Sequence, residues 1–109
     1  MKYNFDTKID NYLPHYCMSC GFANRPLERH HIKGRKNDNH SSYLNAIMLC
    51  KKCHDLAVCN DELSLEYMRK TFKLLHVNHY KLKQKDLDFM HEYKNLYVII
   101  IQEIFGPNT

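Results

Sequence analysis

The sequence lacks a hydrophobic segment long enough to cross a membrane. Its most apolar run, residues 96–101, is far shorter than the stretch of about 20 apolar residues that a membrane-spanning helix needs. Residues 1–10 lack the apolar centre of a signal peptide, because charged side chains are spread through them. Internal repeats and low-complexity segments are missing as well. We therefore expect a soluble, cytoplasmic protein without membrane contact, folded as one domain with or without a helical appendage.

Net charge is also low, at +4 for the whole chain, but it is unevenly distributed. Residues 61–109 hold seven basic and seven acidic side chains, whereas residues 24–54 hold seven basic against two acidic ones. A local excess of positive charge attracts polyanions such as nucleic acid. A solvated basic loop would explain the charge equally well. The basic residues of this segment are Arg25, Arg29, Lys33, Arg35, Lys36, Lys51 and Lys52.

Cysteine, by contrast, is frequent for so short a chain. The count of five is odd and no export signal is evident, which argues against a disulfide framework. Four cysteines form two Cys-x-x-Cys pairs, Cys17 with Cys20 and Cys50 with Cys53. Four thiolates from two such corners give a closed, tetrahedral Zn²⁺ site of the structural kind, which a segment with so few aliphatic residues needs. The fifth, Cys59, is expected to be a small packing residue.

The elements expected around the cysteines are short. Residues 27–32 predict a strand, residues 33–42 a polar loop and residues 46–49 a second strand. A short helix is expected to begin at the second cysteine pair and to run to about Val58.

Helical periodicity dominates the remainder of the chain. Asn60 and Asp61 are good capping residues for a helix that carries an apolar stripe through residues 65–75. A longer helix is predicted from about residue 85 to residue 105, although the β-branched residues near its end leave a strand as the alternative. Its predicted apolar stripe consists of Leu87, Met90, Tyr93, Tyr97, Ile101 and Ile104.

An ordered set of polar residues lies between and just after the cysteine pairs. It reads His30-His31-Ile32, a polar loop, and then Asn45-Ala46-Ile47-Met48-Leu49-Cys50-Lys51-Lys52-Cys53-His54. Over residues 17–58 the chain resembles the HNH, or ββα-metal, endonuclease family, and within it the four-cysteine branch of phage and homing enzymes. The resemblance implies an α+β fold, namely a zinc-stapled ββα-metal core in residues 1–60 followed by two helices in residues 61–109.

The resemblance also implies roles for these residues. His31 would be the general base that activates water, while His30 and His54 would hold a catalytic divalent ion. Asn45 would either position the loop that carries the base or ligate the ion. Many relatives have a further histidine where this chain has Val58, which leaves the third ligand open. Asn45 is the first candidate for it, and Asp38 and His40 follow.

An oxygen ligand would favour Mg²⁺ or Mn²⁺ as the catalytic ion, with Ni²⁺ or Zn²⁺ as alternatives. The expected substrate is double-stranded DNA, cut in a host cytoplasm if the protein is encoded by a phage. Phosphate contacts, which carry no sequence information, are expected from the basic side chains. These are Arg29, Lys33, Arg35, Lys36, Lys51 and Lys52.

Two other classes of protein remain open at this point. One is a catalytically inactive, zinc-dependent nucleic-acid-binding module, and the other is a structural or interaction protein. The helices of residues 61–109 carry no catalytic signature and either pack on the core or form the seam of a homodimer. The isolated histidines are assigned no role and are expected at the surface or between helices. They are His15, His76, His79 and His91.

Overall fold

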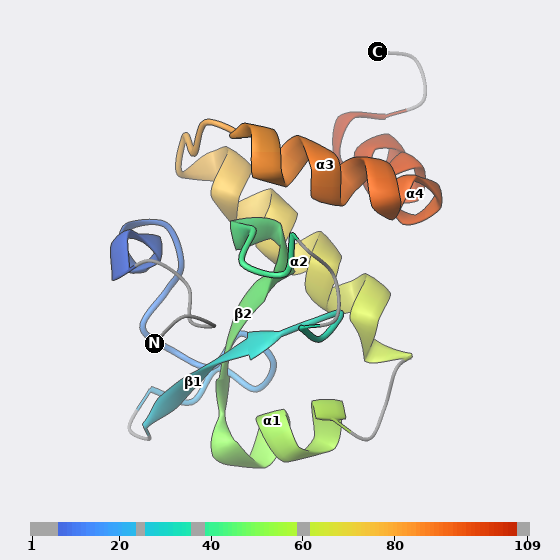
Figure 1. Ribbon diagram of the computed structural model, residues 1–109. Coiled ribbons are helices and arrows are strands. Elements are labelled where there is room, and N and C mark those ends of the chain that lie inside the picture. The colour runs from blue at the N-terminus through green and yellow to red at the C-terminus, as the bar shows by residue number, and fades with distance from the viewer. Residues whose placement is uncertain (1–6, 24–25, 36–38, 59–61, 107–109) are drawn as a thin grey trace.

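The computed structural model describes residues 7–23, 26–35, 39–58 and 62–106. The described elements, in chain order, are the 3-10 helix η1 (Thr7–Asn11), β1 (Leu27–His31), the 3-10 helix η2 (Tyr43–Asn45), β2 (Ala46–Cys50), α1 (Lys51–Val58), α2 (Leu63–Val77), α3 (Gln84–Glu92) and α4 (Lys94–Phe105). Figure 1 shows the two strands in the middle of the molecule, with α1 below them and α2, α3 and α4 above. The predicted α+β class is confirmed, and both strands and α1 begin and end within about one residue of the predicted positions.

The strands form one antiparallel hairpin, in which His30 lies opposite Ile47 and His31 lies opposite Ala46. Every residue of β2 is buried, because neighbouring segments cover it. The backbone N–H of Met18, in the first cysteine pair, donates to the carbonyl of Met48 at 2.8 Å. From the helical side, the Thr71 hydroxyl donates to the carbonyl of Ala46 at 2.6 Å. β2 is thus held between the first cysteine pair and α2.

The helix predicted for residues 85–105 is divided in the structure into α3 and α4. Tyr93 has φ −110° and ψ 35°, outside the helical region, and separates the two. The break allows α3 to contact η2 while α4 contacts α2, which a single straight helix of this length would not do. The predicted apolar stripe is wrong in part. Leu87 and Ile101 are exposed, whereas Phe89 and Ile100 are fully buried. The alternative of a strand near the end of the chain is also wrong, since α4 occupies residues 94–105.

Hydrogen bonds tie the long helices to the hairpin. Asp86, at the first turn of α3, is 1 % exposed and accepts from the Ser42 hydroxyl at 2.6 Å. It also accepts from the Tyr80 hydroxyl at 2.5 Å.

None of the helices in the described part of the chain has the length and apolarity needed to span a membrane. The capping residues predicted at Asn60 and Asp61, and Cys59 before them, lie outside the described residues.

Candidate functional site

Four cysteines from two distant segments meet at one end of the hairpin. The sulfur atoms of Cys17, Cys20, Cys50 and Cys53 all lie within 4.8 Å of one another, and the sulfurs of Cys20 and Cys50 are 3.8 Å apart. Three of the side chains are buried and that of Cys20 is exposed. The predicted pairing of the two Cys-x-x-Cys motifs is therefore confirmed. Four thiols at this spacing match the ligand set of a structural zinc ion.

The four thiols differ in acidity because their surroundings differ. Burial raises the pKa of Cys17, but hydrogen bonds from the backbone N–H groups of Cys20, Cys50 and Ser19 outweigh burial and bring the pKa down to about 6. Burial and hydrogen bonds with the neighbouring thiols raise the pKa of Cys53 to about 12. The backbone is thus arranged to stabilise negative charge on sulfur, which a metal-binding thiolate requires.

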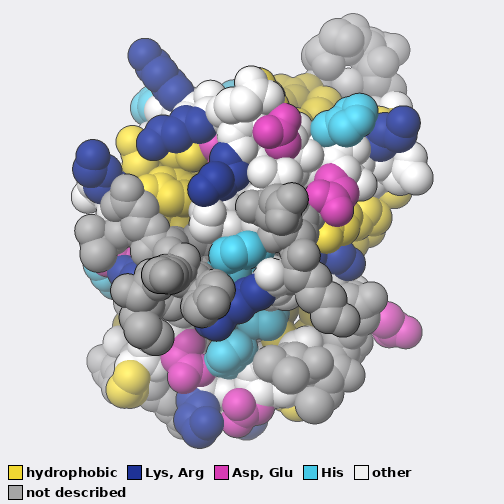
Figure 2. All heavy atoms as spheres, viewed as in Figure 1, with side chains coloured by type: hydrophobic (Ala, Val, Ile, Leu, Met, Phe, Trp, Pro, Cys, Tyr) yellow, Lys and Arg dark blue, Asp and Glu magenta, His cyan; other side chains and the backbone are white. Residues whose placement is uncertain are grey.

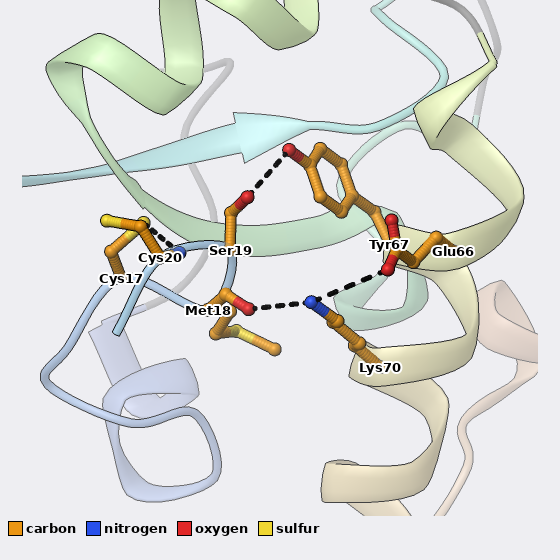
Figure 3. A network of polar contacts seen from close by, with 7 residues as sticks. All are labelled: Cys17, Met18, Ser19, Cys20, Glu66, Tyr67 and Lys70. Atoms are coloured by element: carbon orange, nitrogen blue, oxygen red, sulfur yellow. Dashed lines mark hydrogen bonds and ion pairs between the residues drawn. The ribbon is translucent and has the colours of Figure 1, made fainter. Parts of the chain in front are cut away.

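The first cysteine pair is anchored to α2, as Figure 3 shows. The Lys70 ammonium group donates to the carbonyl of Met18 at 3.1 Å, and the Tyr67 hydroxyl donates to the Ser19 hydroxyl at 3.3 Å. Lys70 also lies 3.8 Å from Glu66, one turn earlier on the same helix. The helical part of the chain therefore fixes the backbone of the cysteine cluster.

His54 follows Cys53 directly in the first turns of α1, so the cysteine cluster also determines where His54 lies. Its ring packs edge-on against the ring of His30, with 4.8 Å between the ring centroids. Its Nδ1 lies 2.5 Å from an oxygen of Glu28. Residues of a strand alternate between its two faces, so Glu28 and His30 share the face of β1 that meets His54. The geometry brings two imidazoles and one carboxylate together.

His30 is held in its neutral form. Burial, together with the nearby His54 and His31, lowers the pKa of His30 to about 4. The neutral imidazole has a free electron pair on one nitrogen and is the form that ligates metal ions. Protons would compete for this nitrogen only as the pH falls toward about 4.

His31 lies at the end of β1, where the strand gives way to the loop. It is 7 % exposed, its Nδ1 accepts a hydrogen bond from Nε of Arg35 at 3.5 Å, and its ring centroid is 5.8 Å from that of His40. Figure 2 shows histidine side chains close together near the middle of one face, with a Lys or Arg side chain between them. His31 contacts Arg35 and His40, and it lies near enough to His30 to contribute to lowering the pKa of His30.

Asn45 is fully buried between the loop and the hairpin. Its Oδ1 accepts from the backbone N–H of Lys33 at 2.8 Å, and its Nδ2 donates to the carbonyls of Gly34 at 3.1 Å and His40 at 2.8 Å. Both ends of the amide therefore hold the loop that follows His31. This favours the positioning role over the ligand role, the two alternatives that the sequence left open.

The predicted phosphate-binding residues that the structure describes have different surroundings. Arg29 lies on the opposite face of β1 from His30 and pairs with Asp10 at 2.8 Å. The Lys33 ammonium group lies 5.5 Å from the ring centroid of Tyr93, Arg35 contacts His31, and Lys51 and Lys52 are exposed at the start of α1. Lys36, and Asp38 as a candidate metal ligand, lie outside the described residues.

Comparison with known proteins identifies the class of this domain. Residues 15–61 match the family model described as HNH endonuclease, and these residues contain the cysteine cluster and the histidines described above. The chain therefore contains an HNH endonuclease domain, and its four clustered cysteines are consistent with the zinc-containing branch of that family. An HNH domain supports a nuclease-type function with a nucleic acid as substrate. Comparisons with curated proteins and with solved structures gave no match.

Sequence reasoning missed one residue of this site. In the sequence, Glu28 is one of the two acidic side chains of residues 24–54 and has no predicted role. In the structure its carboxylate contacts the ring of His54. Strand alternation contained the signal, because a residue two positions before His30 faces the same side of β1. The contact with His54 depends on where α1 packs.

Proposed function

We propose that this chain is a metal-dependent endonuclease that hydrolyses phosphodiester bonds in double-stranded DNA. The observation that supports this most directly is the packing of His30 against His54, and His31 directly follows His30 in the chain. His31 acts as general base. Because Arg35 donates to Nδ1, the proton of the neutral ring lies on Nε2, so Nδ1 is the nitrogen that takes the proton from the attacking water, with Arg35 moving aside. Asn45 is a positioning residue, because it holds the backbone of the loop that follows His31 and contains His40.

We assign His30 and His54 as the donors of a divalent ion. His30 is neutral, and the Nδ1 of His54 is engaged by Glu28, which leaves the other ring nitrogen of His54 for a ligand. When bound, such an ion neutralises charge on the scissile phosphate and stabilises the leaving oxygen. Mg²⁺ or Mn²⁺ is the expected ion, with Ni²⁺ or Zn²⁺ as alternatives, and the four cysteines hold a structural Zn²⁺. Thiolate ligands of this kind are typical of a reducing compartment, so we place the chain in the cytoplasm.

The experiment that tests this function is cleavage of supercoiled plasmid. Zinc-loaded protein is incubated with plasmid and with Mg²⁺, Mn²⁺, Ni²⁺ or Ca²⁺ in turn, and the nicked and linear products are quantified. We expect metal-dependent cleavage by at least one of the first three ions. Salt-dependent binding of plasmid that stays intact with every ion would instead support the alternative function, an inactive zinc-dependent nucleic-acid-binding module.

Removing the charge of Glu28 should lower the affinity of the protein for the catalytic ion. In Glu28→Gln the carboxylate no longer orients His54 or increases the electron density of its ring, and such outer partners typically contribute about 10- to 100-fold in metal affinity. We expect the Mn²⁺ concentration for half-maximal cleavage to rise by about that factor, with most of the rate restored at saturating Mn²⁺.

The matched control for this variant is Asp55→Asn. Asp55 is an exposed carboxylate on α1, directly after His54, and pairs only loosely with Lys51, at 3.8 Å. It should leave the metal dependence unchanged. A Glu28→Gln protein that needs no more Mn²⁺ than the wild type would exclude Glu28 from the metal site.

A homodimer through the last helix stays a prediction. Several apolar side chains of α4 are exposed, namely Val98 at 54 %, Ile99 at 42 %, Phe105 at 38 % and Ile101 at 36 %. A paired enzyme would cut both strands of a duplex, whereas a single copy would tend to nick. The ratio of linear to nicked plasmid in the assay above reports on this difference.

A further inference from the structure

We propose that a second DNA-contacting surface lies outside the HNH domain, around a tyrosine pocket at the turn between α2 and α3. This inference rests on the proposed function in taking DNA as the ligand. The pocket is a depression of about 260 Å³. Its lining consists of Lys8, Asn11, Tyr12, Tyr43, His79, Tyr80, Lys81 and Lys83. On this surface, lysine side chains hold backbone phosphates of the duplex to one side of the cleaved bond.

The first observation is the concentration of positive charge. Residues 79–85 read His-Tyr-Lys-Leu-Lys-Gln-Lys, with three lysines and no acidic residue. The nearest carboxylates in sequence are occupied, because Asp86 is buried with several donors and Asp88 accepts from Gln84 at 2.8 Å. The net charge of residues 61–109 is zero, so the net charge alone does not reveal this cluster of lysines.

The second observation is a cluster of aromatic rings that lines the same pocket as the lysines. The rings of Tyr43 and Tyr80 are stacked with 4.9 Å between centroids, and the ring of Tyr12 meets that of Tyr80 edge-on at 5.0 Å. The Asn78 amide donates to the carbonyl of Tyr12 at 2.7 Å. These contacts hold together the three segments that contain Tyr12, Tyr43 and Tyr80. Segments that are already ordered lose less conformational entropy when a ligand binds to them.

The third observation is the backbone at His79, which has a φ of 61°. This left-handed conformation after a helix is the one for which glycine is strongly preferred. The chain keeps a histidine there, and its side chain lines the pocket. An imidazole at this position provides a further donor for a phosphate.

The surface adjoins the catalytic loop. The Lys85 ammonium group donates to the Ser41 hydroxyl at 2.7 Å, and Ser41 follows His40, whose ring lies 5.8 Å from that of His31. Figure 2 shows Lys and Arg side chains gathered on the upper left of the visible face, above the central histidines. A duplex on this face can therefore contact both regions at once. The longest dimension of the chain, 40 Å, corresponds to about 12 base pairs at 3.4 Å each.

The test compares two double variants on one duplex. Lys81→Gln/Lys83→Gln removes two charges from the surface, and Lys73→Gln/Lys94→Gln removes two from exposed positions on α2 and α4 that do not line the pocket. Affinity for a duplex of about 20 base pairs is measured by fluorescence anisotropy at several salt concentrations. Mg²⁺, Mn²⁺ and Ni²⁺ are omitted so that the DNA stays intact.

We expect Lys81→Gln/Lys83→Gln to bind roughly tenfold more weakly, and its plot of log affinity against log salt to be less steep by about 1.8, since each lost phosphate contact contributes about 0.9. The control should match the wild type in slope. Equal slopes in all three proteins, or equal losses in both variants, would overturn the inference. The plasmid assay decides the proposed function separately. If the wild type binds without cutting, only the nuclease assignment fails; if Lys81→Gln/Lys83→Gln cuts but keeps its salt slope, only the surface fails.

Discussion

Replacing His31 with alanine is expected to reduce the cleavage rate by at least about 100-fold, the usual contribution of a general base. The side chain is buried at the end of β1, where it contacts Arg35 and His40. His30 is a poor substitute, because burial and neighbouring rings lower its pKa to about 4 and make it a weak base. The loss should fall on kcat, because His31 contributes to proton transfer and not to holding the metal or the DNA.

The measurement is single-turnover cleavage of plasmid by His31→Ala, with Mn²⁺ affinity and DNA affinity determined on the same protein. His91→Ala is the control, since His91 is exposed on α3 and should leave the rate unchanged. Thermal unfolding of both variants shows whether the fold is intact. A His31→Ala protein that is folded, binds metal and cuts at the wild-type rate would refute the assigned mechanism. A parallel loss of Mn²⁺ affinity would make His31 a ligand instead of the base.

Removal of the structural metal is expected to unfold the HNH domain. The hairpin is short, β2 is covered partly by the first cysteine pair, and both the cluster and His54 depend on the turn at Cys50 and Cys53. Binding of zinc to four thiolates contributes on the order of 10 kcal/mol or more to the folding of small zinc domains at neutral pH. Net stabilities of whole domains are only about 5–15 kcal/mol, so the metal-free segment should not stay folded.

Two measurements check this prediction. Zinc content should be one ion per chain in the wild type, fall strongly in Cys50→Ser and stay at one in Cys59→Ser, the control at the remaining cysteine. Treatment with a strong chelator should remove the strand signal from circular dichroism and abolish cleavage even when Mn²⁺ is then added in excess. A chain that keeps its fold and one-ion stoichiometry after Cys50→Ser would show that the cluster does not hold the metal.

The parts of the fold that local sequence specifies were predictable. A Cys-x-x-Cys corner fixes its own geometry, and the apolar content of β2 makes that strand recognisable. The spacing from Asn45 to His54 suits a strand that is followed directly by a helix. The last helix was less predictable, because the apolar residues near Tyr97 cover most of the circumference and no single stripe stands out. Which of them are buried depends on contacts with α2 and α3, and these exist only after folding.

The sequence by itself determined which residue types are available for chemistry: four thiols for one metal, a histidine pair before a loop, an asparagine and a further histidine at fixed spacing. Only the tertiary structure decided how those groups are used. It directs the amide of Asn45 to the loop backbone, brings Glu28 against His54, turns Arg29 toward Asp10 and collects lysines around three tyrosines. The physical reason is the distance along the chain over which each effect acts. Ligand spacing and strand alternation act between residues a few positions apart, whereas contacts between side chains on different elements depend on how those elements pack.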